Sequence, residues 1–174
     1  SISPGNKDGF QMKFLSGPLK HTIEVALPLQ GNYQLNNLRT AGAAIALLMD
    51  GLELRELHIK KGIEKVIHNT GLQGRWQKIN ENPLTICDIG HNREGIMMLV
   101  DHLKSMSYSK LHMVFGMVED KEAGEILKLL PKEAQYYFCK ANVPRALDSI
   151  ILANKAEACG LSGKSIPSVK EALK

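Results

Sequence analysis

The sequence has few aromatic residues and no cluster of positive charge, and both absences speak against a nucleic-acid interface. Only 5% of the 174 residues are aromatic, and the net charge is a mild +4 with an isoelectric point near 8.9. The lysines are dispersed among acidic residues and do not form the basic, aromatic-interleaved patch that nucleic-acid binding uses. We therefore expect no nucleic-acid partner.

Cysteine is scarce as well, and no apolar run is long enough to cross a membrane. The three cysteines, Cys87, Cys139 and Cys159, are odd in number and follow neither a disulfide nor a zinc spacing. We expect reduced thiols, no metal site, no signal peptide and no membrane segment. These absences predict a cytoplasmic protein, and a monomer is the simplest expectation.

Several motifs of catalysis and nucleotide binding are also missing. The sequence contains no Walker or dinucleotide-type glycine-rich loop, no HExxH helix and no nucleophile elbow. If the protein uses a nucleotide, its main phosphate-binding loop is therefore expected to lie outside this chain.

The first 70 residues predict a hairpin followed by helices. Apolar and polar residues alternate at 10–14 and 23–27, which is typical of two strands with one apolar face. A helix is predicted at 38–49, with the preceding asparagines, Asn37 among them, as its N-cap. This helix is apolar almost all round, so it should be covered on most sides. A second helical pattern runs over 54–67.

Beyond residue 70 the pattern changes to strands alternating with helices. Strands are predicted at 84–87, 111–115 and 136–139, and helices at 95–106, 121–130 and 145–159. Such alternation is typical of parallel sheets with helical crossovers. We predict an α/β fold with a Rossmann-like, mostly parallel sheet and flanking helices, preceded by the hairpin and helices. Because both ends stop abruptly, we expect a fragment that joins residues 1–70 of one domain to a second domain at 71–174.

Two short polar motifs stand where ligands bind in such folds. Arg75 follows Gly74, Asp88 follows the strand at 84–87, and His91 comes at the start of the next helix. Ligands of α/β sheets bind at the carboxyl ends of the strands. A guanidinium suits phosphate, a carboxylate can accept from a ribose hydroxyl, and a neutral histidine at a helix N-terminus can face a ligand.

Simpler structural roles are available for the same residues. Asp88 could cap the following helix, and Arg75 could stack on Trp76 or pair with Glu81. The occurrence of Asp88 together with His91 favours ligand binding over these roles, and it favours a phosphate contact for Arg75.

The segment at 116–121 offers a further cation after a predicted strand. Lys121 could meet a carboxylate or phosphate, or it could be solvated beside a capping Asp120. The spacing alone leaves both roles open.

Four motifs, taken in order, resemble a known family. They are Gly-Asn-Tyr-Gln-x-x-Asn at 31–37, Gly-Arg-Trp-Gln at 74–77, Asp-x-Gly-His-Asn at 88–92 and Gly-Met-x-x-Asp-Lys at 116–121. Together they are similar to the carboxyl-terminal portion of folylpolyglutamate synthase, often bifunctional with dihydrofolate synthase, in the Mur ligase superfamily. The sequence departs from the family at Gly90 and Arg93, where alanine and proline are frequent, and neither side chain is needed for the implied contacts.

The resemblance implies an ATP-dependent amide ligase. In this family ATP phosphorylates a folate or dihydropteroate carboxylate, and the amino group of L-glutamate attacks the acyl phosphate. Residues 1–70 would be the end of the central ATP-binding domain, and residues 71–174 the glutamate ligase domain, truncated at its end. The Mg²⁺ ligands and the phosphate loop would belong to an absent amino-terminal part, which would be this chain's partner, so the chain alone is not expected to be active.

The resemblance also implies roles for individual residues. Asn37 matches an asparagine near the ATP base, Arg75 an arginine at the ATP phosphates, and Asp88 an acid at the ribose. His91 and Lys121 match positions near the incoming glutamate.

Two alternatives to a folate ligase stay open. One is a ligase of the same superfamily that joins an amino acid to a UDP-muramyl peptidoglycan precursor. The other is a non-catalytic nucleotide-binding module, which the missing phosphate loop would support if these 174 residues were the natural product. The forms of the motifs at 74–77 and 88–92 favour the folate enzyme.

Overall fold

The computed structural model describes residues 2–4, 9–13, 22–31, 33–49, 51–119 and 123–173. The chain forms two compact units, Ser1–Ile89 and Gly90–Lys174. The first compact unit extends to Ile89 and so includes residues 71–89. The domain limits expected from the sequence, 1–70 and 71–174, stay a prediction.

The first unit contains a three-stranded antiparallel sheet of β1 (Ile2–Pro4), β2 (Gly9–Lys13) and β3 (Thr22–Ala26). Strands β2 and β3 confirm the predicted hairpin, with Met12 opposite Ile23. Strand β1 was not predicted, because three residues are too few to display an alternating pattern.

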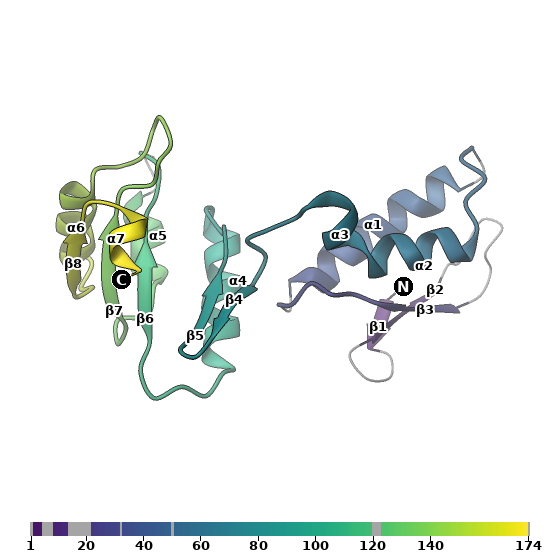
Figure 1. Cartoon of the computed structure of the whole chain (residues 1–174), viewed down its shortest axis with the longest axis horizontal. Coiled ribbons are helices and arrows are strands. Elements are labelled where there is room, and N and C mark those ends of the chain that lie inside the picture. The colour runs from purple at the N-terminus through teal and green to yellow at the C-terminus, as the bar shows by residue number, and fades with distance from the viewer. Residues whose placement is uncertain are drawn as a thin grey trace. The chain divides into compact units, whose positions relative to one another are not determined.

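Helices α1 (Gln34–Leu48) and α2 (Glu56–Glu64) cover one face of this sheet, and the short α3 (Val66–Thr70) follows (Figure 1). Alternation along β3 buries every second side chain, and these side chains meet the buried faces of the helices. The resulting core cluster consists of Met12, Ile23, Val25, Leu38, Met49, Ile59 and Ile63.

Helix α1 differs from its prediction in two respects. It begins at Gln34 with Tyr33 at the N-cap position and no side-chain cap, so Asn37 lies inside the helix and the cap predicted for it is wrong; Asn32 lies outside the described residues. In addition, Leu47 near its end is 84% exposed. Within this unit the helix is therefore buried along one stripe only and not on most sides.

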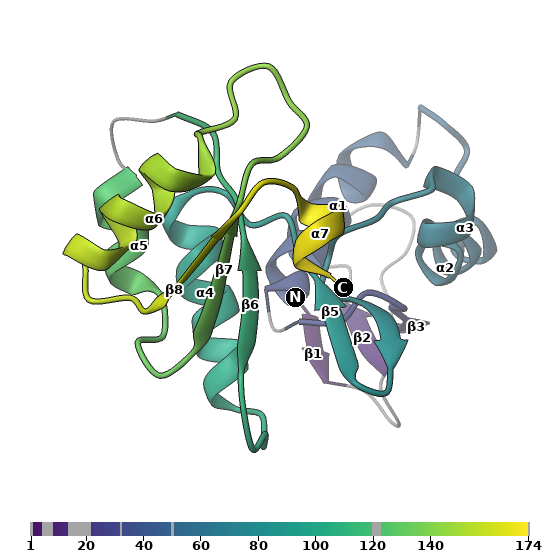
Figure 2. The same cartoon turned by 60° about the vertical axis from the view of Figure 1, so that its left-hand side comes forward.

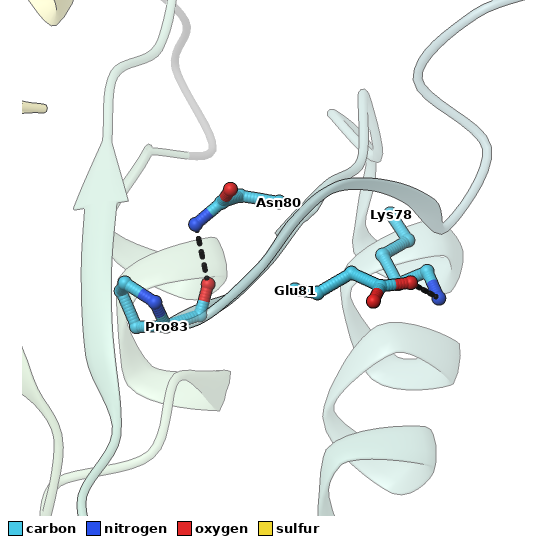
Figure 3. Close-up of polar contacts among 4 residues, drawn as sticks. All are labelled: Lys78, Asn80, Glu81 and Pro83. Carbon is cyan, nitrogen blue, oxygen red and sulfur yellow. Dashed lines mark hydrogen bonds and ion pairs between the residues drawn. The ribbon is translucent and has the colours of Figure 1, made fainter.

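An antiparallel hairpin of β4 (Gln77–Glu81) and β5 (Leu84–Cys87) completes the first unit. It forms a two-stranded sheet of its own. Figure 3 shows the Asn80 side chain turned toward the Pro83 carbonyl, to which its Nδ2 donates at 3.0 Å. Strand β5 confirms a strand at 84–87 that ends just before Asp88. Its expected place in the parallel sheet is wrong, because β5 pairs antiparallel with β4 in a separate two-stranded sheet.

The second unit holds a parallel sheet in the order β6 (His112–Phe115), β7 (Gln135–Cys139), β8 (Gly163–Ile166). Helix α4 (Arg93–Lys104) precedes these strands, α5 (Ala123–Leu129) and α6 (Ser149–Ala158) lie between them along the chain, and α7 (Val169–Ala172) follows them. This parallel sheet with flanking helices confirms the predicted α/β fold. Strand β8 was not predicted, because Gly-Lys-Ser-Ile carries little apolar signal.

The core of the second unit lies between the sheet and helices α4, α5 and α6, of which α5 and α6 run side by side along it (Figure 2). Tyr136 and Phe138 on β7 are fully buried there, with ring centroids 5.3 Å apart. Both side chains point to the same face because they are two residues apart on one strand.

Helix α6 begins four residues later than predicted, at Ser149 instead of residue 145. The cause is Asp148, whose Oδ1 accepts from the backbone N–H of Ile150 at 2.9 Å and so fixes the N-cap. In the described part of the chain, no helix combines the length and the apolar character needed to cross a membrane.

Candidate functional site

A tight backbone turn places Arg75 in the first unit. Gly74 has a φ of +67°, and Trp76, which is 5% exposed, has a φ of +49°. A Cβ on Gly74 would lie only 2.5 Å from Ile89 Cγ2, and the Ile89 N–H donates to the Gly74 carbonyl at 2.9 Å. Glycine is therefore required at this point, both for its conformation and for the close approach of the chain after β5.

The Asp88 carboxylate accepts a hydrogen bond from the backbone of this turn. Its Oδ2 accepts from the Trp76 backbone N–H at 2.8 Å and from the Tyr33 hydroxyl at 2.6 Å. The following helix is capped by a different residue, Asn92, whose Oδ1 accepts from the Gly95 N–H at 2.8 Å. The capping role that the sequence left open for Asp88 is therefore wrong.

Tyr33 lies in the electrostatic field of both charged residues of this site. Burial, followed by the hydrogen bond to Asp88 and its negative charge, raises the pKa of the Tyr33 hydroxyl above its ordinary value, while the charge of Arg75 lowers it. The hydroxyl accordingly keeps its proton at neutral pH and acts as a hydrogen-bond donor to Asp88. The structure thus brings Tyr33, Arg75 and Asp88 together.

The Arg75 side chain is half-buried and lines a cavity of about 190 Å³. Glu81, the acid that the sequence offered as its partner, pairs with Lys78 at 2.7 Å instead (Figure 3). The cavity is lined by Pro28, Leu29, Gln30, Ile67, Leu72, Arg75, Trp76, Gln77 and Lys78.

Asn37, the third predicted nucleotide contact, belongs to the same unit. It lies in the first turn of α1, where its backbone N–H donates to the Tyr33 carbonyl at 3.3 Å. Its side-chain Nδ2 donates to Gln34 Oε1 at 2.9 Å. One helical turn therefore connects Asn37 to the tyrosine that holds Asp88.

His91 lies in the second unit, exposed and directly before Asn92, the N-cap of α4. This confirms the predicted position of His91 at a helix N-terminus. A Cβ on Gly95 would come within 2.9 Å of Asn92 Oδ1 and 3.5 Å of Gly90 Cα, so the glycine allows the tight start of this helix.

The loop after β6 carries the last predicted contact. Val118 forms an antiparallel bridge with Ala146, and the Glu119 N–H donates to the Arg145 carbonyl at 2.9 Å, so the loops after β6 and β7 lie side by side. Lys121, predicted to lie near the incoming glutamate, is outside the described residues.

The described residues contain no cluster of metal-ligating side chains. Over the described ranges from residue 2 to residue 173, no group of three or more His, Cys, Asp or Glu side chains could hold a metal ion.

Sequence reasoning did not assign a role to Tyr33, although the residue lies in the motif at 31–37. The available signal was Gly31 two residues before it, since a glycine beside an aromatic ring allows close packing. The structure shows that a Cβ on Gly31 would lie 2.7 Å from Tyr33 Cε1.

Comparison with known proteins gives the family. The family model described as "Mur ligase, glutamate ligase domain" matches residues 74–174, which is more than half of the chain. The chain belongs to the Mur ligase family. A relative in Haloferax volcanii, a probable bifunctional folylpolyglutamate synthase/dihydropteroate synthase, is 31% identical over 136 residues, covering 78% of this chain and 16% of the relative.

Solved structures of two other proteins share the fold. Escherichia coli FolC in complex with DHPP and ADP is 27% identical with a TM-score of 0.71, covering 99% of this chain and 38% of that chain. Mycobacterium tuberculosis folylpolyglutamate synthase complexed with ADP and AMPPCP has a TM-score of 0.76 at 23% identity, covering 95% of this chain and 36% of that chain. The chain thus spans little more than a third of these proteins, and far less of the Haloferax relative.

Proposed function

We propose that this chain is the glutamate ligase part of an ATP-dependent enzyme that adds L-glutamate to the carboxylate of a folate or dihydropteroate. The observation that carries the proposal is the joint position of Arg75 and Asp88 beside one glycine turn, within a chain of the Mur ligase family. The relatives named as folylpolyglutamate synthases and the neighbours named with bound ADP support the substrates.

The proposed reaction has two steps. A carboxylate oxygen of the acceptor attacks the γ-phosphorus of ATP, the bond to ADP breaks, and an acyl phosphate forms. The amino nitrogen of glutamate then attacks the acyl carbon, phosphate leaves with that carboxylate oxygen, and the nitrogen loses a proton as the amide forms. Phosphoryl transfer of this kind depends on positioning and on neutralising charge more than on covalent help from the protein.

Residues of this chain supply part of that positioning. The Arg75 guanidinium offers a fork of donors to the phosphate oxygens, and the Asp88 carboxylate accepts from the ribose. Asn37 lies near the base. His91 and Lys121 contact the incoming glutamate, for whose carboxylates the Lys121 cation is a natural partner.

The rest of the active site belongs to a part of the protein that this chain does not contain. The sequence has no phosphate loop. As the family resemblance implies, we assign both the phosphate loop and the Mg²⁺ ligands to an amino-terminal ATPase domain. The chain alone is then inactive, and a monomer stays the simplest expectation for the complete protein. The three free cysteines support a cytoplasmic location.

The test is a product-mass assay on the complete protein that carries this chain. It receives ATP, Mg²⁺ and L-glutamate with dihydropteroate, tetrahydrofolate or a UDP-muramyl acceptor, and products are identified by mass spectrometry. We expect a gain of one glutamyl unit on a folate acceptor. A gain on the muramyl acceptor alone would establish the peptidoglycan alternative, and no gain on any acceptor would overturn the ligase.

Variants of Arg75 separate its role from general damage. Arg75→Ala should lower the rate of ligation by about 10²–10³-fold, because a charge-stabilising group of the transition state is lost. Arg75→Lys is the matched control, since it keeps the charge and loses the two-pronged geometry, and it should retain an intermediate rate. Full activity of Arg75→Ala would remove the arginine from the mechanism.

A further inference from the structure

Tyr33 reaches Asp88 across a sequence separation of 55 residues, with a hydroxyl-to-carboxylate distance of 2.6 Å. The distance lies within the range of charge-assisted O–H···O⁻ bonds, which are roughly twice as strong as neutral ones. The second donor to the same oxygen, the Trp76 backbone N–H, comes from the turn after Gly74. Two donors from different segments therefore fix one carboxylate oxygen.

The Tyr33 ring packs closely against the backbone at Gly31. Gly31 has a φ of +100°, and a Cβ there would meet Tyr33 Cε1 at 2.7 Å and Cδ1 at 3.2 Å. The backbone before α1 is held as well, since the Gln34 N–H donates to the Gly31 carbonyl at 3.0 Å. A residue with a side chain at position 31 would therefore displace either the Tyr33 ring or the backbone at position 31.

We propose that Tyr33 is a positioning residue of the nucleotide site, which holds the Asp88 carboxylate in the orientation that accepts a ribose hydroxyl. This inference rests on the proposed function, in which Asp88 contacts the ribose. Tyr33 donates to Oδ2 together with Trp76, so the rotation of the carboxylate about its Cβ–Cγ bond is set before ATP arrives. Loss of the Tyr33 hydroxyl removes the donor that reaches this oxygen from the start of α1 and so weakens the hold on the carboxylate.

Burial and the neighbouring Asp88 raise the pKa of the Tyr33 hydroxyl, so that the hydroxyl keeps its proton. The negative charge of Asp88 and burial keep the Tyr33 hydroxyl protonated, and the nearby positive charge of Arg75 does not reverse this. The protonated hydroxyl is therefore available as a donor to Asp88.

The experiment compares nucleotides in the complete protein with Tyr33→Phe. Steady-state ligation is measured with ATP, 2′-deoxy-ATP and 3′-deoxy-ATP. The wild-type protein should lose at least about tenfold in kcat/KM with the analogue that lacks the accepted hydroxyl, because a bond to a charged group is removed. In Tyr33→Phe the KM for ATP should rise about tenfold, the KM for glutamate should stay unchanged, and the preference for ATP over that analogue should fall toward unity.

Two further variants test whether the effect is specific to the bond between Tyr33 and Asp88. Tyr137→Phe removes a tyrosine hydroxyl bonded elsewhere, to His112 Nδ1 at 3.0 Å, and should leave nucleotide preference unchanged. Gly31→Ala should reproduce the Tyr33→Phe defect by displacing the ring.

The outcomes separate this proposal from the proposed function. If the wild-type protein ligates glutamate without distinguishing ATP from either analogue, the ribose role of Asp88 fails and the role of Tyr33 fails with it, while the ligase stands. If the wild type distinguishes them and Tyr33→Phe keeps the same preference, only the proposal for Tyr33 is overturned. A loss confined to kcat, equal for all three nucleotides, would mark Tyr33 as merely structural and also overturn it.

Discussion

Gly74 carries the backbone conformation on which the Arg75 and Asp88 contacts depend. Its φ of +67° is followed by a φ of +49° at Trp76, so two residues of the turn lie in the left-handed region. The second is not a glycine, and such a conformation is costly for a bulky residue. The hydrogen bond from its N–H to Asp88 at 2.8 Å offsets part of that cost.

Substitution of Gly74 tests this dependence directly. Gly74→Ala should lower the free energy of unfolding by about 1–3 kcal/mol, because the new Cβ meets Ile89 Cγ2 at 2.5 Å in an unfavourable φ region. Urea unfolding of the 174-residue chain can be followed by the fluorescence of Trp76, its one tryptophan.

Gly62→Ala is the matched control for that variant. Gly62 lies within α2, and a Cβ there would have no neighbour within 4 Å, so the change should raise stability by about 0.5–1 kcal/mol. Equal effects of the two substitutions would show that the turn makes no special demand at Gly74.

The sequence predicts the positions of Arg75 and Asp88, but not the contact between Tyr33 and Asp88. A glycine before Arg75 and an apolar run before Asp88 are local patterns, and a strand end is where an acid can meet a ligand. The Tyr33 bond joins residues 55 positions apart, and no local periodicity encodes such a pair. The hydrogen bonds that Asp88 accepts from Tyr33 and Trp76 follow from the three-dimensional structure and not from the local sequence pattern.

Strand β7 could be predicted from the sequence, whereas strands β1 and β8 could not. Its run of Tyr136, Tyr137, Phe138 and Cys139 is apolar enough to predict a strand, and the structure buries three of these four side chains. Strands β1 and β8 lie at sheet edges, are short and contain polar or turn-forming residues, so their pairing comes from neighbours and not from their own pattern. The start of α6 was predicted too early because the residues before the capping Asp148 continue the helical pattern of the sequence.

The burial of Tyr136 and Cys139 on β7 predicts how stability depends on pH. Burial raises the pKa of both groups above their ordinary values, and the charge of Glu133 adds to this for Tyr136. Protons are then bound more tightly in the folded state than in the unfolded state. The stabilisation is complete below the unfolded pKa values, about 8.5 for cysteine and about 10 for tyrosine, and is lost as the pH rises above them.

Urea titrations between about pH 8 and pH 11, read by far-ultraviolet circular dichroism, check this expectation. The free energy of unfolding should decline over this interval. Tyr136→Phe should be less stable at neutral pH by about 1 kcal/mol, since the 2.6 Å bond to the Pro131 carbonyl is lost, but its decline with pH should be shallower. Stability that increases toward pH 11 would contradict the argument from burial.

The two compact units and the family domain do not share a boundary. The family match begins at residue 74, while the second unit begins at Gly90, so hairpin β4–β5 belongs to the family domain and to the first compact unit. Within the first unit, the bond from Tyr33 to Asp88 connects the start of α1 to the residue after β5. The order of helices and strands was predictable from periodicity, but this grouping depends on contacts between distant segments.

Transfer of oxygen from the acceptor to phosphate tests the central claim most directly. The complete protein is given ATP, Mg²⁺, L-glutamate and a folate acceptor whose reacting carboxylate carries ¹⁸O, and the phosphate released is examined by mass spectrometry. An acyl phosphate predicts one ¹⁸O atom in the phosphate for each glutamyl amide formed. Unlabelled phosphate, or label recovered in AMP, would contradict an ATP-dependent ligase of the Mur type.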